Sequence, residues 1–123
     1  MVSQQEIDTY LEDFQKQFAA LLKAKNIDGL VQLYHPDAAF VHAGVDGVVG
    51  RKAIAERLKP FTEDDTDFTV SVTRNLFTGP DAEFIVHEGT FAINAEDGKV
   101  FPYRQIFKKT GGKYLIYHDE YTA

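Results

Sequence analysis

The chain has 123 residues, a formal net charge of −6 and no cysteine, which fits one domain over residues 1–123 built without disulfides or zinc–thiolate sites. The negative charge argues against nucleic-acid and anionic-membrane surfaces, because both require clustered Lys and Arg. No apolar run approaches the length of a membrane span and no basic, apolar leader opens the sequence, so we expect a cytoplasmic protein.

The N-terminal part of the chain predicts two helices. Ser3 and Glu6 have the spacing of a capping box, and an apolar stripe at helical spacing continues to about residue 25. The members of this stripe are Ile7, Tyr10, Leu11, Phe14, Phe18, Leu21 and Leu22. A second, short helix is expected over residues 26–34, because Asn26 can cap it and the residue before Pro36 avoids the helical region.

The middle of the chain predicts one strand and one helix, separated by a glycine-rich loop. The strand is expected over residues 37–43, and Gly44, Gly47 and Gly50 indicate a flexible rim after it. The third helix is expected over residues 51–58 and should end at Pro60, which cannot donate a helical hydrogen bond.

From Phe68 onward the apolar period changes to two, which predicts strands. We expect them over residues 68–73, 82–94, 99–109 and 113–121. Hairpin signals lie at residues 96–98 and 110–112. The element order is therefore ααβαββββ, and helices followed by antiparallel hairpins predict an α+β fold.

Three segments resemble the nuclear-transport-factor-2-like (NTF2-like) superfamily, and with them the resemblance covers essentially the whole chain. They are residues 26–40 (NIDGLVQLYHPDAAF), residues 50–54 (GRKAI) and residues 112–119 (GKYLIYHD). The similarity is greatest to the SnoaL-like and DUF4440 branch. It implies a cone-shaped, cystatin-like fold, in which three helices pack on a curved, mainly antiparallel sheet around a pocket.

The resemblance also allows a test against ketosteroid isomerases, which share this fold. Their hydrogen-bonding Tyr corresponds to Phe18, their general base to His42 and their oxyanion-hole Asp to Arg104. Two of the three roles are lost or inverted, so we reject a steroid isomerase of that design. His42 stays a candidate general base, and Arg104 a candidate anion ligand.

The alternation of side chains along the strands gives a second, independent prediction of which residues face the pocket. The more apolar parity of the strand at residues 82–94 contains Glu88, so we expect Glu88 inside the pocket and His87 on the outer surface. If the hairpin turn centres on Asp97, paired residue numbers sum to about 194, which places Glu88 opposite Ile106 and one diagonal step from Arg104. Two interpretations stay open: a structural ion pair between Arg104 and Glu88, or an Arg104 that orients an anionic ligand.

For the last strand, the sequence does not decide which of its two faces points inward. Tyr117, Asp119 and Tyr121 share one face, and His118 and Glu120 share the other. If the first set points inward, Tyr117 and Asp119 join the candidate ligand-binding residues Arg104, Glu88 and Phe18. The histidines have no metal-like spacing, so we expect neither a metal nor a cofactor.

Two functions fit these observations. The first is a pocket protein that binds a small anionic or apolar-anionic molecule, with isomerase- or lyase-type acid–base chemistry as an extension. The alternative is a non-catalytic interaction module with a vestigial pocket. In both cases we expect a homodimer through the outer sheet face, where Thr69, Ser71 and Thr73 predict a partly polar interface. Whether the protein is an enzyme is left open.

Overall fold

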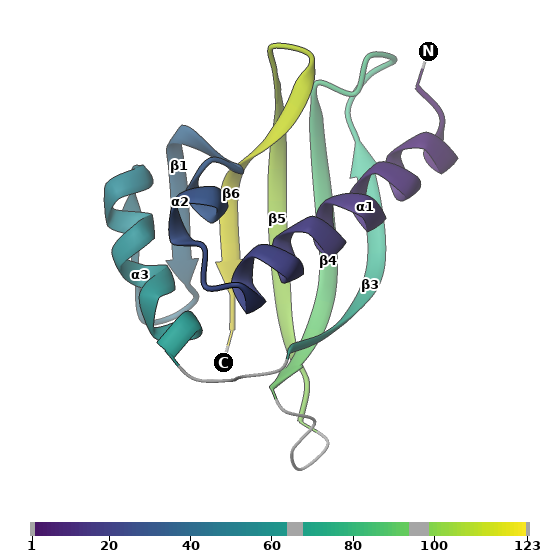
Figure 1. Cartoon of the computed structure of the whole chain (residues 1–123). Helices are drawn as coiled ribbons and strands as arrows, with labels where there is room; N and C mark the ends of the chain where they lie inside the picture. The colour runs from purple at the N-terminus through teal and green to yellow at the C-terminus, as the bar shows by residue number, and fades with distance from the viewer. Residues whose placement is uncertain (1, 64–67, 94–98, 123) are drawn as a thin grey trace.

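A six-stranded sheet carries the fold, and the computed structural model describes residues 2–63, 68–93 and 99–122 (Figure 1). Three helices accompany it: α1 (Gln4–Lys23), α2 (Ile27–Val31) and α3 (Arg51–Glu63). The strands are β1 (Tyr34–His42), β2 (Asp46–Val49), β3 (Phe68–Phe77), β4 (Phe84–Ile93), β5 (Phe101–Thr110) and β6 (Lys113–Tyr121). The predicted α+β class, with helices on a curved sheet, is confirmed. Among the described residues, no helix combines the length and apolarity needed to span a membrane.

The strand order in the sheet is β2-β1-β6-β5-β4-β3. Among the described strands, only the pairing between β1 and β6 is parallel, and the other neighbours are antiparallel. The parallel pair brings the first strand beside the last one, so residues about eighty positions apart in sequence become neighbours. The expected mainly antiparallel sheet is therefore confirmed.

The glycine-rich rim differs from its prediction, because it contains a strand. Asp46 to Val49 form β2, in which Gly47 pairs with Val41 and Asp46 pairs with His42. The observed order is thus ααββαββββ. Gly44, at a φ of +78°, makes the turn before β2, and the short edge strand behind it satisfies backbone groups of β1 that a loop would leave unpaired.

The predicted ends of two helices are also wrong. The second helix stops at Val31, and Tyr34 already begins β1. The third helix continues through Pro60 to Glu63. An interior proline costs about 3 kcal/mol, but the turn that follows it is held by packing: Thr62 is buried and Phe61 stacks edge-on against Tyr121 at 6.0 Å. The hairpin predicted at residues 96–98 lies outside the described residues.

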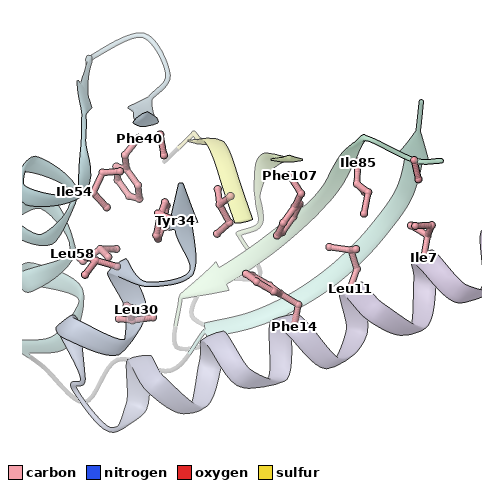
Figure 2. Packing of buried hydrophobic residues seen from close by; sticks show 14 residues of the cluster. Ile7, Leu11, Phe14, Leu30, Tyr34, Phe40, Ile54, Leu58, Ile85 and Phe107 are labelled. Carbon is pink, nitrogen blue, oxygen red and sulfur yellow. The ribbon is translucent and has the colours of Figure 1, made fainter. Parts of the chain in front are cut away.

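Helix α1 begins at the predicted cap, where the Glu6 amide donates to the Ser3 hydroxyl over 3.2 Å. Its apolar stripe crosses the sheet, and Figure 2 shows Leu11 and Phe14 facing strand residues of the core. The rings of Phe14 and Phe107 meet edge-to-face with centroids 4.8 Å apart. The remaining core continues towards α2 and α3 through Leu30, Tyr34, Phe40, Ile54 and Leu58.

Two β-bulges decide which side chains face the helices. In β6 the register shifts opposite Ile106 and Phe107, so that Tyr117 has no partner on β5. In β3 the register shifts between Val72 and Arg74. Each bulge inserts one residue and reverses the alternation beyond it. As a result Ile116 and Asp119 are both buried, although simple alternation would put them on opposite faces.

Candidate functional site

A cavity of about 150 Å³ lies between α1, α3 and the concave face of the sheet. Its walls are mostly aromatic and aliphatic, and its few polar side chains come from α1, β5 and β6. The lining residues are Gln15, Phe18, Ala19, Leu22, Phe40, Leu58, Phe61, Phe68, Val70, Phe91, Tyr103, Gln105, Asp119 and Tyr121. An engineered apolar cavity of comparable volume accommodates benzene, so this one has room for a single small ring.

Asp119 is the ionisable carboxyl group of the cavity wall, and it is only 6% exposed. The Tyr34 hydroxyl donates to its Oδ2 over 2.6 Å, and the Gln105 amide donates to the same oxygen over 3.4 Å. Burial raises the pKa of Asp119 to about 6, although the two hydrogen bonds pull it in the opposite direction. This carboxyl group therefore changes charge close to neutral pH.

The supporting groups of Asp119 come from three different elements. Tyr34 opens β1, Gln105 lies opposite Asp119 in β5, and Gln15 of α1 donates to the Gln105 Oε1 over 2.8 Å. Burial and the nearby carboxylate raise the pKa of Tyr34 well above its ordinary value, so its hydroxyl keeps its proton. A buried carboxylate is costly unless it is hydrogen-bonded, and here two donors are fixed by the surrounding elements.

The electrostatic character of the cavity follows from what lines it. The described lining residues include Asp119 but no Lys, Arg or His. An anion placed here would meet an ionised carboxylate with no compensating positive charge. The cavity thus favours an uncharged ligand, or a cationic one when Asp119 is ionised.

A second buried polar group, His87, lies on the inner face of β4 and is fully buried. Its Nδ1 is 2.6 Å from Asn75 Oδ1, and its Nε2 is 2.7 Å from the Tyr103 hydroxyl. Burial lowers the pKa of His87 to about 4, so the imidazole is neutral at physiological pH. The prediction that His87 faces outward is wrong.

Gly89 makes room for Tyr103. These two residues pair across β4 and β5, and a Cβ at Gly89 would stand 2.5 Å from the Ser71 carbonyl oxygen and 2.9 Å from the Tyr103 hydroxyl. Because a side chain there would collide with backbone as well as with the tyrosine, only glycine lets the Tyr103 ring lie across β4.

The predicted site residues do not all gather at the cavity. Phe18 and Asp119 line it, as expected. Glu88 and Arg104 do not, and their predicted inward orientation is wrong: they pair directly, with residue numbers that sum to 192, on the opposite face of the sheet. There the Arg104 guanidinium donates to Glu88 Oε2 over 2.7 and 3.0 Å, and Arg74 donates to Glu88 Oε1 over 2.6 Å.

The sequence left open which face Tyr117 occupies, and the β6 bulge turns it outward. Its ring contacts His35 edge-on, and the Lys108 ammonium lies 5.3 Å from its centroid. His42 lies at the end of β1, where its ring stacks on Tyr121 with centroids 4.6 Å apart. Tyr121 lines the cavity and His42 does not, so general-base catalysis by His42 stays a prediction.

Sequence reasoning missed four polar residues of the interior: Asn75, His87, Tyr103 and Gln105. One signal was available, since the parity of β5 opposite to Arg104 contains Tyr103, Gln105 and Phe107 and could have been read as the inner row. Within residues 2–63, 68–93 and 99–122, no group of three or more acidic or histidine side chains is arranged to hold a metal ion.

Comparison with known proteins identifies the family. The model of the SnoaL-like domain matches residues 15–116, so the chain belongs to the SnoaL-like family. Among curated proteins, none matches the sequence at a significant level.

Solved structures with this architecture confirm the NTF2-like, cystatin-like fold. A Novosphingobium aromaticivorans protein provisionally named scytalone dehydratase is 14% identical, with 98% of this chain and 87% of that one covered and a TM-score of 0.76. An NTF2-like protein of unknown function from Shewanella oneidensis is 9% identical, with 94% and 98% covered and a TM-score of 0.76. A cystatin-like domain from Nostoc punctiforme is 13% identical, with 94% and 75% covered and a TM-score of 0.75. At these identities the similarities establish the fold alone.

The raised pKa of Asp119 predicts a specific pH dependence of stability. The folded protein holds this proton up to about pH 6, whereas the unfolded chain releases it near 3.8, so the contribution of Asp119 to stability is full below about pH 4 and is lost as pH rises through 6. Replacing it by asparagine removes that loss. In denaturant titrations we expect Asp119→Asn to gain up to about 3 kcal/mol of stability relative to wild type between pH 4 and pH 7.5.

The free energy of unfolding of Asp119→Asn is compared with that of wild type at each pH, because His87 makes stability depend on pH in the opposite direction. Its lowered pKa means that stability present above pH 6.5 is lost as pH falls towards 4, and this term is common to both proteins. A difference between variant and wild type that does not change with pH would contradict the account.

Proposed function

We propose that this protein binds a small, uncharged, ring-sized molecule in the cavity and exchanges a proton with it through Asp119. One observation carries the proposal: a buried carboxyl group whose pKa lies at about 6 forms part of the wall of an otherwise apolar cavity. A group that titrates near the working pH is both a competent base and a competent acid. Perturbed ionisable groups in concave apolar sites are frequent markers of function.

The arrangement of hydrogen bonds supports this role for Asp119. In the described part of the chain, both hydrogen bonds to the carboxyl group end on Oδ2. Oδ1 is therefore the oxygen available to a bound molecule. Tyr34 and Gln105 act as positioning residues, since they hold the carboxylate in one orientation and stabilise its charge after a proton has been given up.

The proton transfer suits isomerase- or lyase-type chemistry. Oδ1 removes a proton from a carbon next to a carbonyl group. The protonated Asp119 then returns this proton at another carbon, which is an isomerisation. Alternatively, it delivers the proton to a β-hydroxyl group while the electron pair forms a C=C bond and the C–O bond breaks, so that water leaves, which is an elimination. The Novosphingobium protein carries the name of a dehydratase. Elimination of water by this chain would be a reaction of the same type on the same fold.

The ligand we propose is uncharged, which differs from the anionic ligand that the sequence suggested. That expectation rested on Arg104, whose side chain is 49% exposed and bonded to Glu88 on the outer face. Inside the cavity an anion would be repelled by Asp119. Neutral β-hydroxy ketones of one ring are the simplest molecules that present both an acidic C–H and a leaving hydroxyl group.

The proposal is tested with 3-hydroxycyclohexanone as the probe. We expect the wild-type protein to accelerate exchange of its α-protons with D₂O, or its loss of water, with a rate that rises as pH passes through about 6. Asp119→Asn should reduce the rate by at least about a hundredfold. Proton NMR follows both reactions, and Asp37→Asn, at an exposed position of β1, is the matched control.

Equal rates in wild type and Asp119→Asn would refute the chemical step. A wild-type protein that fails to bind any neutral ring-sized probe in a thermal-shift screen would refute the pocket function itself.

We also propose a homodimer through the outer sheet face, because an apolar row crosses it. Leu76, Val86 and Ile106 pair with one another across β3, β4 and β5, and Leu76 is 49% exposed. We expect light scattering at micromolar concentration to give twice the 13.9 kDa mass of one chain, and Leu76→Glu to shift the protein to the monomer. A monomeric wild type would contradict the dimer.

A further inference from the structure

A chain of four hydrogen-bonded side chains connects the surface of α1 with the cavity. Asn75 Nδ2 donates to Asp8 Oδ1 over 3.0 Å, His87 Nδ1 lies 2.6 Å from Asn75 Oδ1, and His87 Nε2 lies 2.7 Å from the Tyr103 hydroxyl. Asp8 is exposed, and Tyr103 lines the cavity. We call these four residues the relay; the proton-transfer step proposed for Asp119 does not use it.

The direction of every hydrogen bond in the relay follows from Asp8. A carboxylate only accepts, and hydrogen bonds from Asn75 and Gln4 lower the pKa of Asp8, which keeps it ionised. The Asn75 amide must therefore turn its NH₂ group to Asp8 and its carbonyl oxygen to His87.

The orientation of Asn75 fixes the tautomer of His87. A carbonyl oxygen accepts, so His87 Nδ1 carries the proton and donates to it. The buried imidazole is neutral, which leaves a lone pair on Nε2. The Tyr103 hydroxyl then has to donate to Nε2, so toward a ligand in the cavity that Tyr103 lines its oxygen can only accept.

Other polar groups of the cavity wall are partly engaged with one another. Gln105 uses its amide to donate to Asp119, and Gln15 uses its amide to donate to Gln105. Asp119, when ionised, accepts only. Tyr103 and Asp119 lie on the concave face of neighbouring strands, since Tyr103 is two residues before the Gln105 that pairs with Asp119.

We propose that the relay makes the cavity selective for an apolar ligand that carries a hydrogen-bond donor, a hydroxyl or amine group, directed at the Tyr103 oxygen. This inference rests on the proposed pocket function and specifies its ligand class. A ligand with a carbonyl group alone would leave the Tyr103 lone pairs unsatisfied and would bring two acceptors together.

The first measurement is the tautomer of His87 by long-range ¹H–¹⁵N correlation NMR on the wild-type protein near pH 7. We expect a protonated Nδ1 and an unprotonated Nε2. A protonated Nε2 would overturn the relay, whatever the ligand results are.

The second measurement compares two probes of matched size, cyclohexanol and cyclohexanone, by NMR titration. We expect wild type to bind cyclohexanol about tenfold more tightly, the effect of one hydrogen bond. Tyr103→Phe should abolish the difference, whereas Tyr117→Phe on the outer face should preserve it.

The double variant Asp8→Asn/Asn75→Asp is the sharpest test, because it moves the carboxylate one step along the relay without changing net charge. The new carboxylate beside His87 favours the imidazolium, whose Nε2–H then donates to Tyr103 and turns the hydroxyl proton towards the cavity. We expect the preference for cyclohexanol to be lost or inverted. The ¹⁵N signal of His87 Nε2 reports the direction of the hydrogen bond to Tyr103, and it should show a protonated nitrogen in this variant.

The outcomes separate this inference from the proposed function. Equal affinities for both probes in wild type, or a preference for cyclohexanone, would overturn the donor selectivity while leaving a ligand pocket. Binding of neither probe would count against the pocket function and, with it, the selectivity. An unchanged preference in a folded double variant would show that the relay does not set it.

Discussion

The hydrogen bond between the Tyr34 hydroxyl and Asp119, 2.6 Å long and fully buried, is the interaction on which the site depends. A carboxyl group in an apolar interior needs donors, and the fold supplies them by pairing β1 in parallel with β6. Tyr34 occupies the first position of β1, next to the tip of α2, so the short second helix and its early end help to place the hydroxyl group. Gln105 and Gln15 then extend the support to β5 and α1.

The interior therefore holds two hydrogen-bonded polar systems. One surrounds Asp119, and the other runs from Asp8 to Tyr103. They differ in charge behaviour, since burial raises the pKa of the carboxyl group to about 6 and lowers that of the imidazole to about 4. Between these values the carboxyl is protonated and the imidazole is neutral, so the region around the cavity is least charged at mildly acidic pH and gains the Asp119 charge as pH rises.

Much of the architecture is predictable from local sequence. Local patterns predicted three features that the structure contains: the helix cap at Ser3, the amphipathic helix α1 and the strand that begins at Phe68. Pro60 shows the limit of such preferences, because the packing of Phe61 and Thr62 carries α3 beyond the proline.

The orientation of the site residues was harder to predict, for two physical reasons. Bulges reverse the alternation inside β3 and β6, and nothing in a single sequence marks them. In β4 the inner row contains His87 and Gly89, which look unsuited to a core. His87 is buried because Asn75 and Tyr103 satisfy both of its nitrogens, and Gly89 is there because a Tyr103 ring crosses it. Both reasons depend on partners in other strands.

The orientation of the arginines on the outer face also depends on a partner in another strand. A charge among apolar neighbours suggested a ligand inside the cone, yet Arg104 and Arg74 share Glu88 on the convex side, where solvent reaches them. The chemistry of the cavity instead centres on one carboxyl group. Its protonation is measured most directly by titrating the ¹³C signal of the Asp119 carboxyl group. The account predicts a midpoint at about pH 6; a midpoint near 3.8, the ordinary value for an aspartate, would contradict it.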